Sequence, residues 1–352
     1  MRRKLFKVFA LILLIGLLIY LFYSPQLEFD VLENPNHTKH SQPEKAEKVP
    51  QNSEENPKLT SGLGMYIGQS LGQVTSEFGT PDRIYNYQKG YRQYIFKNQN
   101  HYLIFSTKNQ QVKSVYITGK ETSKLTGPIK INDRASDLFN TFSINTEPQF
   151  EVKGKTYHFE LSDRDVKTQA LIQFGQTYAQ VFIDQQKNKV VGVRYLDKEA
   201  LADMNPYPQN SEGVSVQPDH LTEERPPDQN VNERLTLYEL TNEMRQLNGR
   251  RTLKINHILE NVATVDLFNA GEQGTAEFTE ENLLALMKQT KLSYQSVSQN
   301  VGYNFNDVPT LVNSWINSDV HRSRMLNTKY VEFGGDVEQQ YYMLIFLEKG
   351  DS

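Results

Sequence analysis

One histidine of this chain lies in a sequence context that could support catalysis. His321 closes the stretch Trp-Ile-Asn-Ser-Asp-Val-His in a sequence of 352 residues. An imidazole can act as a general base for a hydroxyl nucleophile, which would make the protein a hydrolase. Ser298, Ser318 or Thr275 would then have to lie within hydrogen-bond reach of His321. The competing interpretation is a hydrogen-bonded structural histidine that closes the turn after a helix.

The residue types present restrict the other chemistry that the chain can support. There is no cysteine, which excludes a disulfide framework, a thiolate metal site and a cysteine nucleophile. A zinc site needs three or four nitrogen or oxygen donors around one ion, and a lone His321 offers too few. We therefore expect no metal and no cofactor. The formal net charge of -4 gives no electrostatic reason to expect nucleic-acid binding.

The region that positions His321 has the pattern of four helices with two strands after them. Apolar residues recur at helical spacing after residues 233, 256, 279 and 307, and Pro309 fits the first turn of the fourth helix. The runs at 331–337 and 341–347 are typical of strands. This order predicts a compact α/β/α sandwich over residues 231–349.

Three motifs in this region resemble those of the bacterial CAP-domain family, a name that covers cysteine-rich secretory proteins, antigen 5 and pathogenesis-related 1. The first looks like the family's opening helix, the second like its Gly-Glu-Asn segment, and the third like its Trp-x-x-Ser-x-Gly-His-Arg block. They are Asn242-x-x-Arg245-x-x-x-Gly249, Gln299-Asn300-Val301, and Trp315-Ile316-Asn317-Ser318-x-x-His321-Arg322. Their order and spacing imply the CAP fold for residues 231–349.

The resemblance also implies a cleft that holds histidines and carboxylates in family members, and a divalent metal in some of them. In this chain the cleft residues would be His321, Gln299, Asn300, Glu277 and Arg322. Gln299 replaces the family glutamate, and Glu277 stands close to the place of a histidine that is missing here. We therefore expect a degenerate cleft without a metal, in which Asn300 and Arg322 brace the wall.

A second folded region precedes a proline-rich linker at residues 202–230. Residues 59–201 contain two loose copies of a helix with a strand meander after it, which suggests a smaller, duplicated α+β domain. Its place before the CAP region resembles that of the CAP-associated N-terminal domain of bacterial proteins. Its tyrosines would either form an aromatic binding face or, as is more usual in strands, alternate between core and sheet surface. They are Tyr85, Tyr87, Tyr91, Tyr94 and Tyr102.

The N-terminus predicts where the protein resides. Basic residues precede an apolar run at 8–23 that approaches the ~20 residues of a membrane-crossing helix. Because a basic flank stays in the cytoplasm, we expect a single-pass signal anchor at 1–23, with the bulk of the chain outside the cell membrane. A cleaved signal peptide is the alternative, but no small-residue cleavage site follows the run. Residues 24–58 are polar and proline-rich, and they predict a disordered tether.

Two main classes of function fit these observations. The first is a non-enzymatic module of the bacterial cell envelope that binds a lipid, a cell-wall glycan or peptide, or an envelope protein. The second is a hydrolase acting on peptide or cell-wall material, with His321 as its base. The degenerate cleft and the tether favour the first class. It also remains open that residues 59–201 carry the function while the CAP region is scaffold, since function belongs to sites rather than folds.

Overall fold

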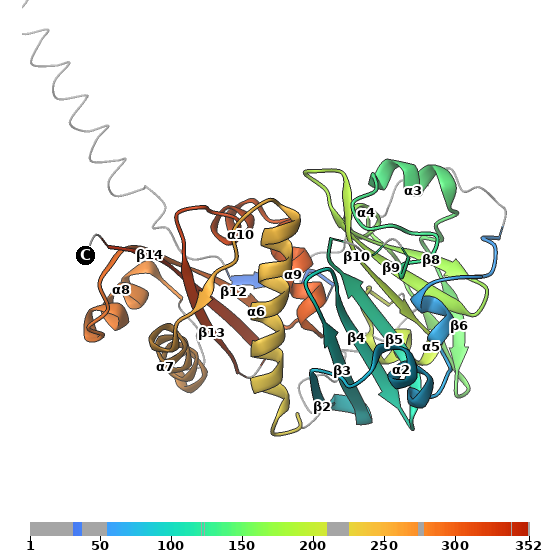
Figure 1. Ribbon diagram of the computed structural model, residues 1–352, viewed down its shortest axis with the longest axis horizontal. Helices are drawn as coiled ribbons and strands as arrows, with labels where there is room; N and C mark the ends of the chain where they lie inside the picture. The colour runs from blue at the N-terminus through green and yellow to red at the C-terminus, as the bar shows by residue number, and fades with distance from the viewer. Residues whose placement is uncertain are drawn as a thin grey trace, which may run out of the picture.

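The computed structural model describes residues 31–36, 55–120, 122, 124–209, 225–273, 278–338 and 340–350. These residues form two bodies that lie side by side, each built on its own sheet (Figure 1). The predicted anchor at 1–23 lies outside the described residues, as do Thr275 and Glu277. Within the described ranges, no helix combines the length and the apolar character that crossing a bilayer requires.

The first body is an antiparallel seven-stranded sheet in the order β2-β3-β4-β5-β10-β9-β8. Its strands are β2 (Arg83–Tyr87), β3 (Tyr91–Lys97), β4 (Tyr102–Lys108), β5 (Gln111–Thr118), β8 (Gln169–Phe174), β9 (Thr177–Asp184) and β10 (Lys189–Leu196). Two meanders, β2–β5 and β8–β10, meet where β5 pairs with β10. The helices that open the two copies are α2 (Leu71–Phe78) and α3 (Ala135–Thr141). The copies expected from the sequence correspond to the two halves of one sheet.

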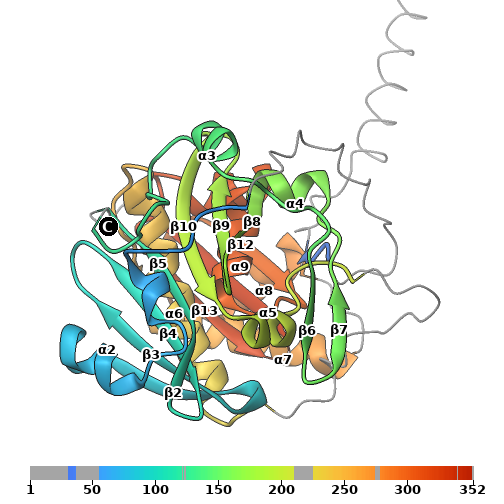
Figure 2. The same cartoon turned by 90° about the vertical axis from the view of Figure 1, so that its right-hand side faces the viewer.

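One face of this sheet is covered by α2 and α3. Val74 of α2 is fully buried there, and the rings of Phe78, Phe96 and Phe105 pack with centroids 5.6 to 5.9 Å apart. Shorter elements complete the body. They are two 3-10 turns (Leu63–Tyr66 and Gln88–Gly90), the hairpin of β6 (Gln149–Val152) and β7 (Lys155–His158), α4 (Asp163–Thr168) and α5 (Lys198–Met204). Figure 2 shows α4, α5, β6 and β7 among them.

The second body is a three-layer sandwich around a five-stranded sheet in the order β1-β12-β14-β13-β11. Its strands are β1 (Val31–Glu33), β11 (Lys254–Ile255), β12 (Tyr294–Tyr303), β13 (Glu332–Glu338) and β14 (Tyr341–Lys349). One face is covered by α6 (Gln229–Leu247), α9 (Val308–Ile316) and α10 (Asp319–Met325), and the other by α7 (His257–Gln273) and α8 (Glu280–Gln289). The α/β/α sandwich expected from the sequence is confirmed. The sequence predicts the strands β13 and β14, but not β1, β11 and β12. In β12 polar residues interrupt the alternation that marks a strand.

The strand β1 corrects the expectation that all of residues 24–58 lack fixed structure. It pairs in parallel with the last three residues of β12 at the edge of the sheet. Asn36 then donates from Nδ2 to Asp165 Oδ1 (2.9 Å) and to the Pro206 carbonyl (2.8 Å), so this short segment contacts both bodies. Three residues are too few to predict a strand from sequence, but an existing sheet edge supplies their backbone partners.

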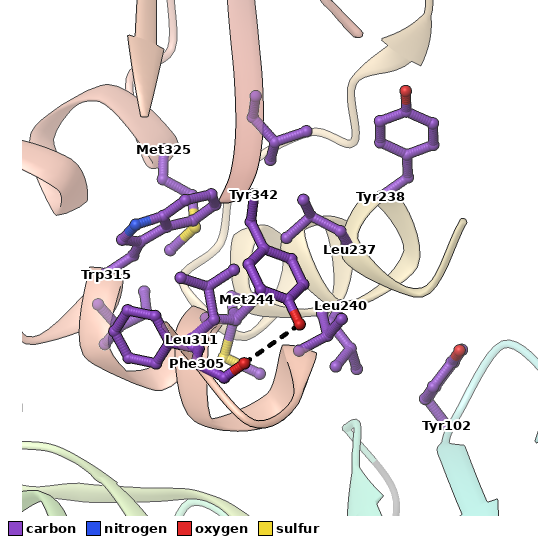
Figure 3. Packing of buried hydrophobic residues seen from close by; sticks show 14 of the residues in the cluster. Tyr102, Leu237, Tyr238, Leu240, Met244, Phe305, Leu311, Trp315, Met325 and Tyr342 are labelled. Atoms are coloured by element: carbon purple, nitrogen blue, oxygen red, sulfur yellow. Dashed lines mark hydrogen bonds between the residues drawn. The ribbon is translucent and has the colours of Figure 1, made fainter. Parts of the chain in front are cut away.

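The second face of the seven-stranded sheet packs directly on α6 and α9. Tyr85 and Tyr102 belong to the same buried cluster as Leu240, Leu311 and the other α6 and α9 residues, part of which Figure 3 shows. Of the five tyrosines singled out above, four lie on this face of the sheet, and they are Tyr85, Tyr87, Tyr91 and Tyr102. The fifth, Tyr94, lies in the core on the opposite face. The aromatic face is therefore the surface on which the second body docks.

Ion pairs accompany this apolar contact. Arg83 Nη2 lies 2.8 Å from Glu239 Oε2 of α6, and Arg194 Nη2 lies 2.9 Å from Asp307 Oδ2 at the start of α9. The ordered part of the first body also extends beyond residue 201, where the sequence places the linker. The helix α5 continues to Met204. Tyr207 is then fully buried, and its hydroxyl donates to the Gln169 carbonyl (2.6 Å).

Candidate functional site

The strand β12 places polar side chains on both faces of the five-stranded sheet. Ser298 and Asn300 pair with residues of β14 that point toward α6 and α9, so they face the α9–α10 side. Gln299 pairs with Ile345, whose cluster includes α7 and α8, so it faces the other side. All three side chains are buried. The family motif residues at this strand are thus divided between two layers.

His321 packs at the junction of α9 and α10. Its ring is 1% exposed and lies parallel to the indole of Trp315, with the centroids 6.2 Å apart. Its Nδ1 lies 2.9 Å from Ser318 Oγ, and its backbone carbonyl accepts from Asn300 Nδ2 (2.9 Å). Ser318 therefore meets the distance that a hydrolase would require. Ser298 Oγ, in contrast, has no hydrogen-bond partner among the described residues.

A carboxyl group that sequence analysis missed lies on the opposite face, in the layer that contains Gln299. Asp266 occupies the buried side of α7 between Ala263 and Leu267 and is 5% exposed. Burial raises the pKa of its carboxyl from 3.8 to about 6. Its Oδ2 has no hydrogen-bond partner among the described residues. The signal that could have found it is the interruption of an apolar helical face by one acidic residue.

Gln299 is the most unusual side chain of this layer. It is fully buried, and neither its Nε2 nor its Oε1 has a hydrogen-bond partner among the described residues. A buried primary amide that is unpaired at both atoms is rare in proteins, because each atom has lost its water. Gln299 and Asp266 are thus two unsatisfied polar groups between the sheet and the pair α7–α8.

Arg322 is directed away from this layer, toward the first body. Its Nη1 donates to the Ile316 carbonyl (2.8 Å) and its Nη2 to Asp184 Oδ2 at the end of β9 (2.9 Å). The arginine therefore braces the domain junction.

The opening motif is also structural. Arg245 is buried and donates to the carbonyls of Arg251, Met325 and Asn327, at 2.8, 2.6 and 3.0 Å. Burial, with a smaller contribution from Arg250, lowers the pKa of Arg245 to about 10. One guanidinium thus joins the end of α6 to the end of α10.

A metal site would need several ionisable donors in one place. Among the described residues, no group of three or more histidine, aspartate or glutamate side chains is arranged to hold an ion. Glu277 lies outside this part of the chain, so its place relative to His321 stays a prediction.

Two sequence profiles match this architecture. The profile described as CAP-associated N-terminal matches residues 67–207, and that of the cysteine-rich secretory protein family matches residues 238–343. A solved cysteine-rich secretory protein from Staphylococcus aureus, SAV1118, is 48% identical to this chain. The similarity covers 92% of this chain and 100% of that one, with a TM-score of 0.82. This protein belongs to the cysteine-rich secretory protein family.

Two further relatives match most of the chain at lower identity. An extracellular protein from Bacillus anthracis that contains an SCP domain is 23% identical over 86% of this chain and 100% of its own, with a TM-score of 0.73, which shows the common fold. The uncharacterized membrane protein YlbC of Bacillus subtilis is 24% identical over 82% of this chain and 84% of its own. The first body is accordingly the CAP-associated N-terminal domain and the second is the CAP domain.

Proposed function

We propose that this protein is a membrane-anchored, extracytoplasmic binding module of the cell envelope, whose CAP domain takes up a polar ligand without cleaving it. The Gln299 side chain carries the proposal, because both of its buried amide atoms have no partner among the described residues. Leaving such groups unpaired costs about 1–3 kcal/mol each. Because Gln299 is fully buried, the layer between the sheet and α7–α8 would have to open to admit a ligand. A ligand with a neighbouring donor and acceptor, such as an amide or a hydroxyl pair, would then satisfy both atoms.

The chemistry of Gln299 supports binding over catalysis. A carboxamide neither gains nor loses a proton near neutral pH, so it cannot act as the acid or base that a glutamate in the same place would provide. Asp266 in the same layer has its pKa raised to about 6 by burial. It can therefore donate or accept a hydrogen bond to a ligand according to its protonation state.

A substitution of the amide tests this proposal. Gln299→Leu keeps most of the side-chain volume but removes both polar atoms, and Gln295→Leu at an exposed position of β12 is the matched control. The full chain in detergent would be titrated calorimetrically with phospholipid vesicles, soluble cell-wall glycans and cell-wall peptides. We expect one class to bind, with affinity reduced about tenfold or more by Gln299→Leu alone. Equal binding by both variants would contradict the proposal.

The membrane anchor is supported by the apolar run at 8–23 and its basic flank. It is also supported by the name of YlbC as a membrane protein and by the extracellular relative from Bacillus anthracis. Because the chain has no cysteine, single introduced cysteines report sidedness without background. We expect Ser53→Cys to react with a membrane-impermeant maleimide on intact cells and Lys4→Cys to react only after lysis. The reverse pattern, or release of Ser53→Cys into the medium, would refute the anchor.

A hydrolase is the second candidate, and the contact between Ser318 Oγ and His321 Nδ1 is the observation that favours it. The pair could in principle form a nucleophile and its base. Purified full-length protein would be assayed for release of products from cell-wall peptides, alongside Ser318→Ala and His321→Ala. Product release by the wild type that both variants abolish would establish hydrolysis. We expect no release from any of the three.

A further inference from the structure

An open groove of about 560 Å³ lies on the surface at the junction of the two domains. Residues of both domains line it. They are Gln186 and Lys187 from the turn between β9 and β10, Asn248 and Arg250 after α6, and Ser323 and Asn327 in and after α10. The groove is separate from the layer that contains Gln299, because none of its lining residues belongs to β12, α7 or α8.

Contacts across the junction hold the groove in shape. Gln186 Nε2 donates to Asp319 Oδ1 (2.5 Å), and Arg322 Nη2 donates to Asp184 Oδ2 (2.9 Å). Asn317 bonds to the backbone at the end of β9 through Nδ2 and Oδ1, at 2.8 and 2.9 Å. The groove therefore depends on the docking of the N-terminal domain onto the CAP domain. Neither domain alone carries all of its lining.

The electrostatic character of the groove is positive, although the whole chain has a net charge of -4. Lys187 and Arg250 are exposed cations that line it. Arg245 donates to the carbonyl of the lining residue Asn327, and among the described residues it contacts backbone carbonyls and no carboxylate. Against Lys187, Arg250 and Arg322, the lining has one carboxylate, Asp319, which keeps its charge while it accepts a hydrogen bond from Gln186. Local cations thus outnumber local anions, and a recess focuses their field.

Apart from Leu326, the rest of the lining is polar and uncharged. Asn248, Ser323, Asn327 and Thr328 offer amide and hydroxyl groups, which hydrogen-bond well to ligand hydroxyls. The volume of the groove is within the range of about 300–1,000 Å³ that is typical of ligand sites. Its openness to solvent suits an extended chain that lies along it rather than a small molecule enclosed by it.

From these features we infer that the groove binds a hydroxyl-rich anionic chain, in which phosphate or carboxylate groups are spaced along sugar or polyol units. Lys187 and Arg250 would pair with the anionic groups, and the amide and hydroxyl side chains would bond to the hydroxyls between them. This site goes beyond the proposed binding at Gln299 and would give the two-domain arrangement a function of its own. The CAP domain and the N-terminal domain would then act together as one receptor surface.

The test uses the full chain in nanodiscs of phosphatidylcholine, which carry no net charge. Fluorescent oligomers of glycerol phosphate and of galacturonic acid, with neutral dextran beside them, would be titrated by fluorescence anisotropy. We expect one or both anionic oligomers to bind and dextran not to bind. Binding should weaken steeply when NaCl rises from about 50 to about 500 mM, because salt screens exposed charges. The stronger of the two oligomers identifies the anionic group.

Charge reversal distinguishes the groove from general attraction to the protein. We expect Lys187→Glu with Arg250→Glu to weaken anionic binding at least about tenfold. The matched control, Lys288→Glu with Lys291→Glu, changes the net charge equally at exposed positions on and after α8 and should leave binding unchanged. Equal losses in both double variants, no loss in the first, or equal binding of dextran would overturn the inference. Binding at Gln299 is measured with different ligands and variants, so either proposal can fail without the other.

Discussion

Arg322 of α10 and Asp184 at the end of β9 form an ion pair across the domain junction, with Nη2 and Oδ2 2.9 Å apart. The two residues lie 138 positions apart in the chain, and their side chains are 10% and 1% exposed. Arg322 also donates to the Ile316 carbonyl, so one guanidinium joins the N-terminal domain to the end of α9, next to the helix that carries His321. The arginine of the family's His-Arg motif therefore couples the two domains of this protein.

Removal of one partner of this pair should destabilise the junction. Asp184→Ala would leave a buried guanidinium without its counter-charge, and we expect the free energy of unfolding to fall by about 3 kcal/mol. Urea denaturation followed by circular dichroism measures this change. The double variant Asp184→Ala with Arg322→Met should recover part of the loss, because it removes the unpaired charge as well. A loss below about 1 kcal/mol would show that the pair is solvated like a surface ion pair.

The buried carboxyl of Asp266 should make stability depend on pH. Its pKa in the folded protein, about 6, lies above the ~3.9 of an unfolded aspartate, because burial disfavours the charged form. Its protonated form favours folding, so this contribution is fully present below about pH 4 and is lost as the pH rises through about 6. Between pH 4 and pH 7, wild-type protein should lose about 2 kcal/mol relative to Asp266→Asn.

Urea denaturation of both proteins across this pH range checks the prediction for Asp266. Asp133→Asn changes an exposed aspartate and serves as the matched control. Parallel stability curves for Asp266→Asn and the wild type would show that the carboxyl titrates normally in the folded state.

The strand β1 should protect the edge of β12. Val31 and Leu32 pack into the apolar clusters on opposite faces of the sheet. Leu32→Asp would place a charge at the rim of the larger cluster and detach the strand. We expect amide hydrogens in the last three residues of β12 to exchange at least about tenfold faster, as measured by hydrogen–deuterium exchange and mass spectrometry. Glu33→Gln, which alters an exposed side chain of the same strand, should leave exchange unchanged.

Gly334 allows α7 to pack closely on β13. A Cβ atom at this position would lie 2.6 Å from the backbone nitrogen of Glu260 and 2.6 Å from Leu259 Cβ. Because a shift of the helix backbone costs free energy, Gly334→Ala should lower the free energy of unfolding by about 2 kcal/mol or more. Gly72→Ala in α2 is the opposite case, since its new methyl group meets only Ser70 Oγ at 3.8 Å. That variant should be stabilised by about 0.5–1 kcal/mol, and equal effects of the two would contradict the packing argument.

The CAP motifs can be recognised in the sequence, but the sequence does not show what their residues do. Asn242 exchanges two hydrogen bonds with the backbone of Leu253, at 2.8 and 3.1 Å, and Arg245 donates to three backbone carbonyls. Both residues match the family motif by residue type, but in the structure their side chains bind the backbone. Gln299 and Asn300 are adjacent in the chain but face opposite layers, because alternate residues of a strand point to opposite sides. This division follows only once β12 is known to be a strand.

Apolar spacing by itself determined α6, α7, α8 and α9 of the CAP domain and hence its α/β/α sandwich, since amphipathic periodicity is carried by neighbours in the chain. The short helix α10, which carries His321, was not predicted. Only the tertiary structure decided that Asp266 is buried, that Val31–Glu33 form a strand, and that the tyrosine face is a docking surface for the CAP domain. The physical reason is the same in each case. Burial and edge pairing depend on which surfaces arrive from distant parts of the chain, and a local pattern does not contain that information.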